Sequence, residues 1–164
     1  MPNPGLMPEQ DWHASLPGVI ASAAGLISDG GGRLLVVKPN YRDHWTLPGG
    51  VCELGESPLD GCAREVAAEI GLPLRVGRLL AVDWRPPPDY GPRARPSLHF
   101  IFDCGVLPSL SGVRLQAEEL DDCRFAPESE LGSLLPDSSL GRVRAALAAL
   151  ASGCVRYVPD AVTG

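Results

Sequence analysis

The stretch GVCELGESPLDGCAREVAAEIGL, residues 50–72, decides the fold of this chain because it combines a turn, a capped helix and a row of charged side chains. Ser57 is a preferred N-cap residue, and Pro58 suits the first position of a helix. Gly71 suits the position just beyond a helix end. The pattern therefore predicts a helix that begins at Pro58 and ends before Gly71.

The expected helix has one apolar face. Leu59, Ala63, Val66 and Ile70 are separated by four, three and four residues, and this spacing places them along one side of a helix. We expect that face to anchor the helix against the protein core.

Two glutamates of the same helix form a candidate cation site. Glu65 and Glu69 are one turn apart, so they project from nearly the same flank, away from the apolar face. Like charges at this spacing mildly destabilise an isolated helix, and a shared divalent cation would offset that cost. Gly49 lies in the turn before the helix, where the lack of a side chain lets its carbonyl oxygen approach a bound ion.

A second charged pair is expected to fix the turn against the helix. Glu56 precedes the helix and Arg64 lies inside it. The planar guanidinium of arginine is suited to charge-assisted hydrogen bonds with a carboxylate. We therefore expect an ion pair between Glu56 and Arg64 with a mainly structural role.

The spacing of these residues resembles the signature of the Nudix hydrolase (MutT-like) family. That signature is G, five residues, E, seven residues, then R-E-U-x-E-E-x-G-U, with U an aliphatic residue. The matching residues are Gly50, Glu56, Arg64, Glu65, Val66, Glu69, Gly71 and Leu72. Ala68 departs from the signature because it occupies the position of a family glutamate. The mixed residue types at fixed spacing make the resemblance specific.

The resemblance implies a fold and a reaction. The fold is an α/β (α+β) structure, an α/β/α sandwich with a mixed β-sheet. The reaction is hydrolysis of a nucleoside diphosphate linked to another moiety, as in a nucleoside triphosphate, a nucleotide sugar or a dinucleoside polyphosphate. Such a pyrophosphatase uses Mg²⁺ or Mn²⁺ held by signature glutamates. Glu69 is then the first candidate ligand, and Glu65 is a second ligand or the group that orients the attacking water.

The missing acid at Ala68 predicts weaker binding of one metal ion or a changed number of ions. Glu118 and Glu119, in the segment QAEELDDCRF, are candidates to replace the lost oxygen ligand. The alternative is a noncatalytic nucleotide-sensing or protein-interaction domain that keeps the scaffold with a weakened metal site. The presence of both Glu65 and Glu69 favours the enzyme.

Length and pattern predict one domain. The chain has 164 residues, enough for one core without metal or disulfide support. We expect an extended N-terminal arm at 1–17, a single domain at 18–158 and a C-terminal tail at 159–164. Besides the helix that starts at Pro58, the apolar patterns predict strands at 19–28, 33–38, 45–47, 75–84, 98–106 and 124–126 and a helix at 140–151.

Charge and cysteine content limit the partners and the compartment. The net charge of −6 gives no basic surface for stable nucleic-acid binding. The five cysteines include no C-x-x-C pair, which favours a reducing cytoplasm. No apolar run is long enough to cross a membrane. We expect a nucleotide-type small molecule as the substrate and leave a homodimer open.

The loop at 85–97 is the expected site of substrate selection. Trp45, Trp84 and Tyr90 are candidates to stack on a base, although core packing is the more common role of such aromatics. Pro87 resembles a feature of members that hydrolyse ADP-ribose, whereas Tyr90 resembles a feature of members that hydrolyse dinucleoside polyphosphates. A nucleoside triphosphate remains open as well. His99 lies in an apolar strand, so we expect a core histidine with satisfied hydrogen bonds.

Overall fold

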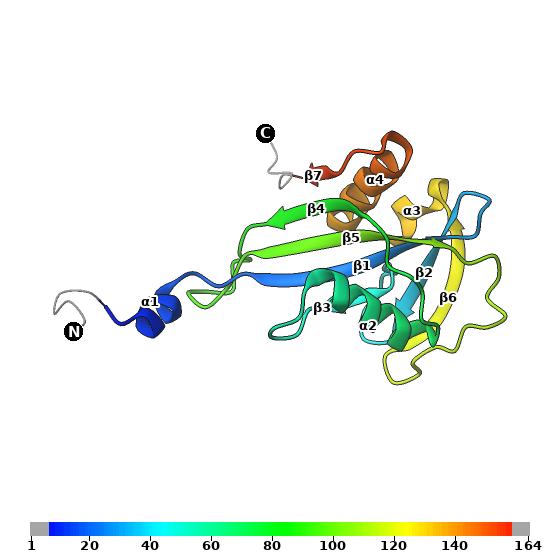
Figure 1. Cartoon of the computed structure of the whole chain (residues 1–164). Coiled ribbons are helices and arrows are strands. Elements are labelled where there is room, and N and C mark those ends of the chain that lie inside the picture. Colours follow the sequence, from blue (N-terminus) through cyan, green and yellow to red (C-terminus); the bar gives the residue numbers. More distant parts are fainter. Residues whose placement is uncertain (1–6, 159–164) are drawn as a thin grey trace.

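One mixed β-sheet organises the computed structural model, which describes residues 7–158 (Figure 1). The strands and helices of the described part are α1 (Glu9–Ser15), β1 (Ile20–Ser28), β2 (Arg33–Pro39), β3 (Gly49–Val51), α2 (Pro58–Ile70), β4 (Leu79–Arg85), β5 (Ser97–Val106), β6 (Leu120–Pro127), α3 (Glu128–Leu134), α4 (Asp137–Ser152) and β7 (Arg156–Val158). The first six residues of the expected arm and the expected tail lie outside the described residues.

The strands are ordered β6-β2-β1-β5-β4-β7, and the short strand β3 pairs with β1 off this path. The pairs β1/β5 and β4/β7 are parallel, whereas β1/β2, β1/β3, β2/β6 and β4/β5 are antiparallel. Parallel and antiparallel pairs in one sheet confirm the expected mixed sheet.

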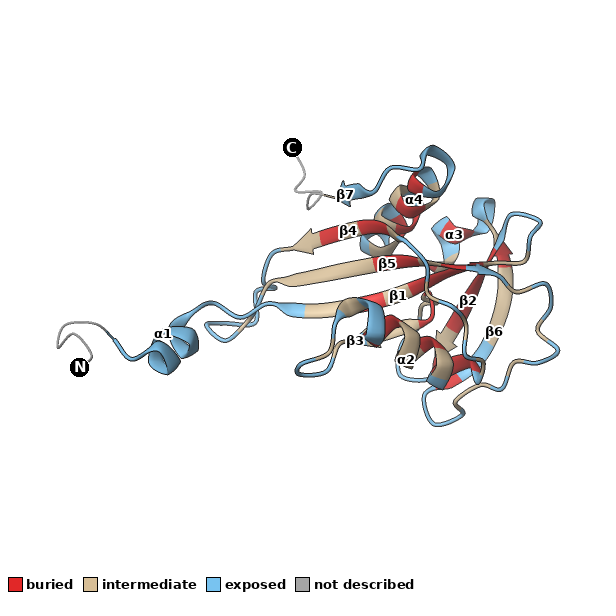
Figure 2. Ribbon diagram, viewed as in Figure 1, coloured by how far each residue is buried: buried red, intermediate tan, exposed pale blue. Residues whose placement is uncertain are grey.

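Strand β2 shows how the layers are built, because both of its faces are buried. Leu34 and Val36 pack in a cluster with residues of α3 and α4, while Leu35 and Val37 pack in a second cluster with residues of α2. Side chains alternate across a strand, so one continuous apolar run supplies both clusters. Helices therefore cover the two faces of the sheet, and Figure 2 shows buried residues along its central strands.

Helix α2 has the expected bounds and caps. The Ser57 hydroxyl accepts a hydrogen bond from the backbone N–H of Asp60 at 3.2 Å, and Gly71 adopts the left-handed conformation with φ of 68°. The predicted apolar face was wrong at one end, because Leu59 is 44% exposed. The stripe against the sheet runs through Cys62, Val66 and Ile70, which turns Leu59 toward solvent.

The expected extended arm at 1–17 was wrong at Glu9–Ser15, which forms the helix α1. Acidic side chains in its first turn favour a helix start there. No residue of α1 is buried, and the helix projects away from the sheet (Figure 1). Its place in the fold is therefore set by the chain that leads into β1, not by packing.

Several boundaries differ from the predicted ones. Residues 45–47 form only an isolated bridge between Thr46 and Val37, and the strand in this region lies at Gly49–Val51. The pattern misplaced the start of β4 and missed α3 and β7, because short elements depend on their tertiary neighbours more than on their own periodicity. None of the helices in the described part of the chain is long and apolar enough to span a bilayer.

Candidate functional site

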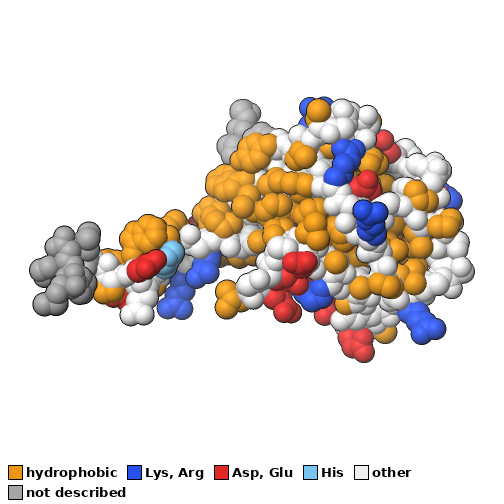
Figure 3. Space-filling view, in the orientation of Figure 1, with side chains coloured by type: hydrophobic (Ala, Val, Ile, Leu, Met, Phe, Trp, Pro, Cys, Tyr) orange, Lys and Arg blue, Asp and Glu red, His pale blue; other side chains and the backbone are white. Residues whose placement is uncertain are grey.

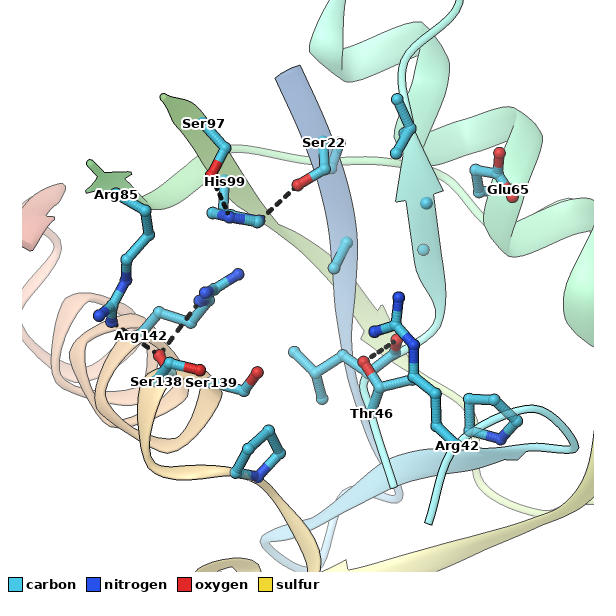
Figure 4. A pocket seen from close by; sticks show the side chains of 18 of the residues that line it. Ser22, Arg42, Thr46, Glu65, Arg85, Ser97, His99, Ser138, Ser139 and Arg142 are labelled. Atoms are coloured by element: carbon cyan, nitrogen blue, oxygen red, sulfur yellow. Dashed lines mark hydrogen bonds between the residues drawn. The ribbon is translucent and has the colours of Figure 1, made fainter. Parts of the chain in front are cut away.

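A cavity of about 780 Å³ lies between α2, the strands β1, β3 and β5, and the start of α4. Glu65, Glu69 and Glu119 line one part of it, whereas Arg85 and Arg142 line another. A third arginine of the wall, Arg42, lies apart from these two (Figure 4). Figure 4 places Glu65 and Arg85 at opposite sides of the view. Figure 3 shows hydrophobic side chains over the middle of one face, with acidic side chains beside them near β3 and α2. The cavity thus has an acidic end and a basic end.

The acidic end is fixed by a contact between β3 and α2. The backbone N–H of Gly49 donates a hydrogen bond to Glu69 Oε2 at 2.8 Å. Gly49 pairs with Ala24 of β1 and has a φ of 152°, and a Cβ at this position would overlap the Ala23 carbonyl oxygen and lie 2.5 Å from the Ala24 Cα. A glycine is therefore needed for β3 to approach both β1 and the Glu69 carboxylate.

Glu69 is a buried carboxylate, with only 5% of the residue exposed. Burial is the main cause that raises its pKa, to about 8; the Gly49 N–H lowers the pKa, and the charges of Glu65 and Glu119 add to the rise. A divalent cation at this end would reverse that preference and favour the ionised carboxylate. The chemistry of the available oxygen atoms therefore fits a hard cation such as Mg²⁺ or Mn²⁺.

Arg64 connects the two other acids of this region. Its Nε donates to Glu56 Oε1 at 2.8 Å, and its Nη1 donates to Glu65 Oε1 at 2.6 Å. The first contact is the ion pair that the sequence predicts, and it lowers the pKa of Glu56 to about 2 together with a backbone hydrogen bond from Glu53. The second contact was missed, because helical spacing does not show that the long arginine side chain reaches its sequence neighbour.

Gly50 leaves room for the Glu65 carboxylate. A Cβ added to Gly50 would lie 2.6 Å from Glu65 Cδ. Arg64 thus holds the Glu65 carboxylate from one side, while Gly50 leaves space for it on the other. Gly71, at the far end of α2, lies beside the backbone of Arg114. A Cβ added to Gly71 would lie 2.8 Å from the Arg114 carbonyl oxygen.

The segment before β6 brings Glu119 to the acidic end. The backbone N–H of Gln116 donates to the Glu69 carbonyl at 3.1 Å, and that of Arg114 donates to the Ile70 carbonyl at 2.9 Å. Of the two acids that the sequence singles out, Glu119 lines the cavity and Glu118 does not. Within residues 7–158 no three His, Cys, Asp or Glu side chains are close enough together to hold an ion by themselves. A cation here would therefore need backbone, water or phosphate oxygens as well.

His99 lies at the cavity, on β5. Its Nδ1 is 2.5 Å from Ser22 Oγ and its Nε2 is 3.0 Å from Ser97 Oγ, so both ring nitrogens have partners as expected. Burial, with the nearby Arg142 and Arg85 charges, lowers the pKa of His99 to about 4. The imidazole is therefore neutral near pH 7. Its contribution to the cavity wall was not predicted, because the strand pattern does not show which face borders a hollow.

The three aromatic candidates occupy different environments. Tyr90 lines the cavity and is largely exposed in the loop between β4 and β5. Trp45 packs against the α3 and α4 cluster, and the Arg124 guanidinium lies 5.4 Å from its ring centroid. Trp84 is half-buried on β4, and neither tryptophan lines this cavity. The structure thus brings Tyr90, but not Trp45 or Trp84, to the cavity wall.

The mixed sheet with helices on both faces, and the acidic helix at the cavity, define the class of fold, and comparison with known proteins gives the family. The NUDIX domain matches residues 19–146, so the chain belongs to the Nudix hydrolase family. A MutT-like protein of Streptomyces ambofaciens is 44% identical over 61 residues, which cover 37% of this chain and 40% of that protein. The chain spans less than half of the length of the curated relatives that it matches.

Solved structures show the same fold. The structure of a UDP-X diphosphatase matches with a TM-score of 0.69 at 20% identity. The match covers 93% of this chain and 75% of the diphosphatase chain. An ADP-ribose pyrophosphatase from Streptococcus suis 89-1591 matches with a TM-score of 0.67 at 22% identity. This match covers 87% of the present chain and 100% of the pyrophosphatase chain. At these identities the likeness establishes the architecture.

Proposed function

We propose that this protein is a divalent-metal-dependent pyrophosphohydrolase. Its substrate would be a nucleoside diphosphate linked to another moiety, and the reaction would be attack of water at phosphorus. The observation that carries the proposal is the buried Glu69 carboxylate, which faces a cavity together with Glu65 and Glu119. Without a cation the buried Glu69 carboxyl favours its neutral form, so a divalent cation that keeps Glu69 ionised and bridges it to a pyrophosphate accounts for the arrangement.

The proposed roles follow from the contacts. Glu69 would hold the metal while the Gly49 N–H fixes the orientation of its carboxylate. Glu65, oriented by Arg64, would be a second ligand or would orient the attacking water. The Gly49 carbonyl and Glu119 are further candidate ligands, and Glu118 is a weaker one because it lies outside the cavity wall. When bound, Mg²⁺ or Mn²⁺ would stabilise the charge on the phosphate oxygens and activate water.

The substrate class rests on the cavity as a whole. A volume of about 780 Å³ is within the range of sites for small molecules, and the exposed Tyr90 at its wall could stack on a base. Nucleotide sugars, ADP-ribose, dinucleoside polyphosphates and nucleoside triphosphates are all candidates. The UDP-X diphosphatase and the ADP-ribose pyrophosphatase share this fold. A substrate screen should therefore include UDP-linked compounds and ADP-ribose.

The proposed setting is a reducing cytoplasm, without stable nucleic-acid binding and with a homodimer as an open alternative. The five cysteines are free thiols, which supports a compartment that does not favour disulfides. The acidic net charge supports a small-molecule partner in preference to a polyanion.

The test is a phosphate-release screen over these nucleotide classes with Mg²⁺, with Mn²⁺ and with a chelator. We expect metal-dependent turnover of at least one class, abolished by the chelator and by Glu69→Gln. Nucleotide binding without turnover under every condition would instead identify a noncatalytic domain. Gly141→Ala is a suitable control, because a Cβ there meets no atom within 4 Å and the residue is exposed on α4.

A further inference from the structure

The basic end of the cavity contains a buried charge cluster that the proposed hydrolysis does not use. Asp83 is fully buried on β4, and its Oδ2 lies 3.0 Å from Arg85 Nε and 2.9 Å from Arg142 Nε. Two guanidinium groups thus share one carboxylate oxygen. The three side chains together carry one net positive charge beside the cavity.

Arg142 is the member of this cluster with unused donors. Its side chain is only 14% exposed, and its Nε also lies 3.4 Å from the Ser138 carbonyl oxygen. No hydrogen bond joins its terminal Nη atoms to the residues that the structure describes. Figure 4 shows the guanidinium projecting into the cavity near His99 and Ser139. Among the described residues, Asp83 Oδ1 is the only fully buried polar side-chain atom without a hydrogen-bond partner, so the Arg142 Nη atoms are open to the cavity. An occupant with acceptor oxygens could accept hydrogen bonds from them there.

Apart from its partner Asp83, the groups that face Arg142 at this end of the cavity carry no negative charge. The groups that face it are Arg85, Asp83, the neutral His99 and the hydroxyl-bearing residues at the start of α4. Helix α4 spans 16 residues, and its N-cap, Pro136, offers no side-chain hydrogen bond to the first turn. Asp137 lies in the first turn and is exposed, so it offsets part of the positive end of the helix, and the two arginines carry most of the positive charge here.

We propose that Arg142, supported by Arg85 and the first turn of α4, binds an oxyanion on the part of the substrate remote from the scissile pyrophosphate. The inference rests on the proposed function and narrows it. Preferred substrates carry a second acidic group, a carboxylate or a phosphate ester, beyond the diphosphate. The guanidinium fork matches either group with two parallel hydrogen bonds, and Asp83 holds the fork in place.

Two substrate pairs that differ in a remote acidic group test this site. UDP-glucuronate against UDP-glucose tests a carboxylate, and ADP-ribose 2′-phosphate against ADP-ribose tests a phosphate ester. We expect kcat/KM of the wild type to favour the acidic member of at least one pair by about tenfold or more. Arg142→Gln should bring that ratio close to one, and Gly141→Ala should leave it unchanged.

The variant is designed to keep the fold. In Arg142→Gln the buried Asp83 still pairs with Arg85, so no carboxylate is left uncompensated. If this variant nevertheless unfolds, Arg142→Lys keeps the charge but loses the planar fork, and it should reduce the ratio several-fold. Equal rates within both pairs for the wild type, or the wild-type ratio in the Arg142 variant that folds, would overturn the proposal.

A binding measurement separates this proposal from the proposed function. Inorganic phosphate is titrated against the whole protein with a chelator present, and the shift in Tm is recorded. Without metal, the acidic end repels phosphate, so we expect equal stabilisation of wild type and Glu69→Gln and loss of the effect in Arg142→Gln. That pattern without any turnover would support the anion site and overturn the hydrolase. Equal shifts in all three proteins, or none in the wild type, would overturn the anion site.

Discussion

Glu69 and Gly49 are 20 residues apart in the sequence, yet the Gly49 N–H donates a 2.8 Å hydrogen bond to Glu69 Oε2. The contact fixes a buried carboxylate at the wall of the cavity, and it would survive in Glu69→Gln because an amide oxygen can accept it. We expect this variant to fold and to lose at least about 100-fold in kcat, since metal-assisted charge stabilisation contributes several kcal/mol. Turnover assays and Tm measurements check the two parts. A Glu69→Gln variant that kept wild-type kcat would exclude Glu69 as the principal ligand.

The neighbouring glycines Gly49 and Gly50 should respond differently to alanine. At Gly49 the added Cβ meets the β1 backbone at a positive φ, so Gly49→Ala should lower the free energy of unfolding by more than about 2 kcal/mol. At Gly50 the Cβ meets the Glu65 side chain, which can move. Gly50→Ala should therefore mainly weaken metal binding, so that the rate needs more Mg²⁺. Denaturant unfolding and Mg²⁺ titration of the rate compare them. Equal losses of stability would contradict this distinction.

Restoring the family acid tests the significance of Ala68. The residue is exposed on α2, so Ala68→Glu should change stability by less than about 0.5 kcal/mol. If the missing oxygen limits metal occupancy, the variant should reach half-maximal rate at several-fold lower Mg²⁺. Ala68→Gln separates the effect of charge from that of size. An unchanged Mg²⁺ requirement in Ala68→Glu would mean that the site is completed elsewhere.

Glu119 is placed to supply the metal ligand that Ala68 lacks, and Glu118 is its matched control. Glu119 lines the cavity and its charge contributes to the raised pKa of Glu69, whereas Glu118 does not line the cavity. We expect Glu119→Ala to raise the Mg²⁺ concentration for half-maximal rate about tenfold, as for loss of a weak ligand. Glu118→Ala should leave it unchanged. The same Mg²⁺ dependence in both variants would remove Glu119 from the proposed ligands.

The Glu56–Arg64 ion pair predicts a pH dependence of stability. Arg64 holds the pKa of Glu56 at about 2, below the ordinary value of 4.5. The unfolded state therefore binds more protons in this range, and the stabilisation is fully present above pH 4.5 and is lost as the pH falls toward 2. Glu56→Gln should be less stable than wild type at pH 7, and the difference should shrink in acid. Glu53→Gln is the control, since Glu53 is 72% exposed and 3.9 Å from Arg64. A pH-independent difference for Glu56→Gln would contradict the electrostatic origin.

Local signals in the sequence were sufficient for some elements. Ser57, Pro58 and Gly71 act on backbone groups within a turn of themselves, so the bounds of α2 could be predicted from neighbours alone. The apolar run of β2 likewise indicated a strand, and the structure buries it on both faces. The exposure of Leu59 could not be predicted, because the buried face of α2 could include either Leu59 or Cys62. Only the packing of the helix on the sheet decides between the two.

The sequence by itself determined the capped helix, the family and the set of acids that accompanies it, since these depend on fixed spacings within 23 residues, 50–72. The tertiary structure decided which of those acids is buried, because burial of Glu69 requires the pairing of β3 with β1 and the segment that leads to Glu119. It also decided the basic end. Asp83 and Arg142 lie on β4 and α4, and only the packing of that helix on the sheet brings their charges together.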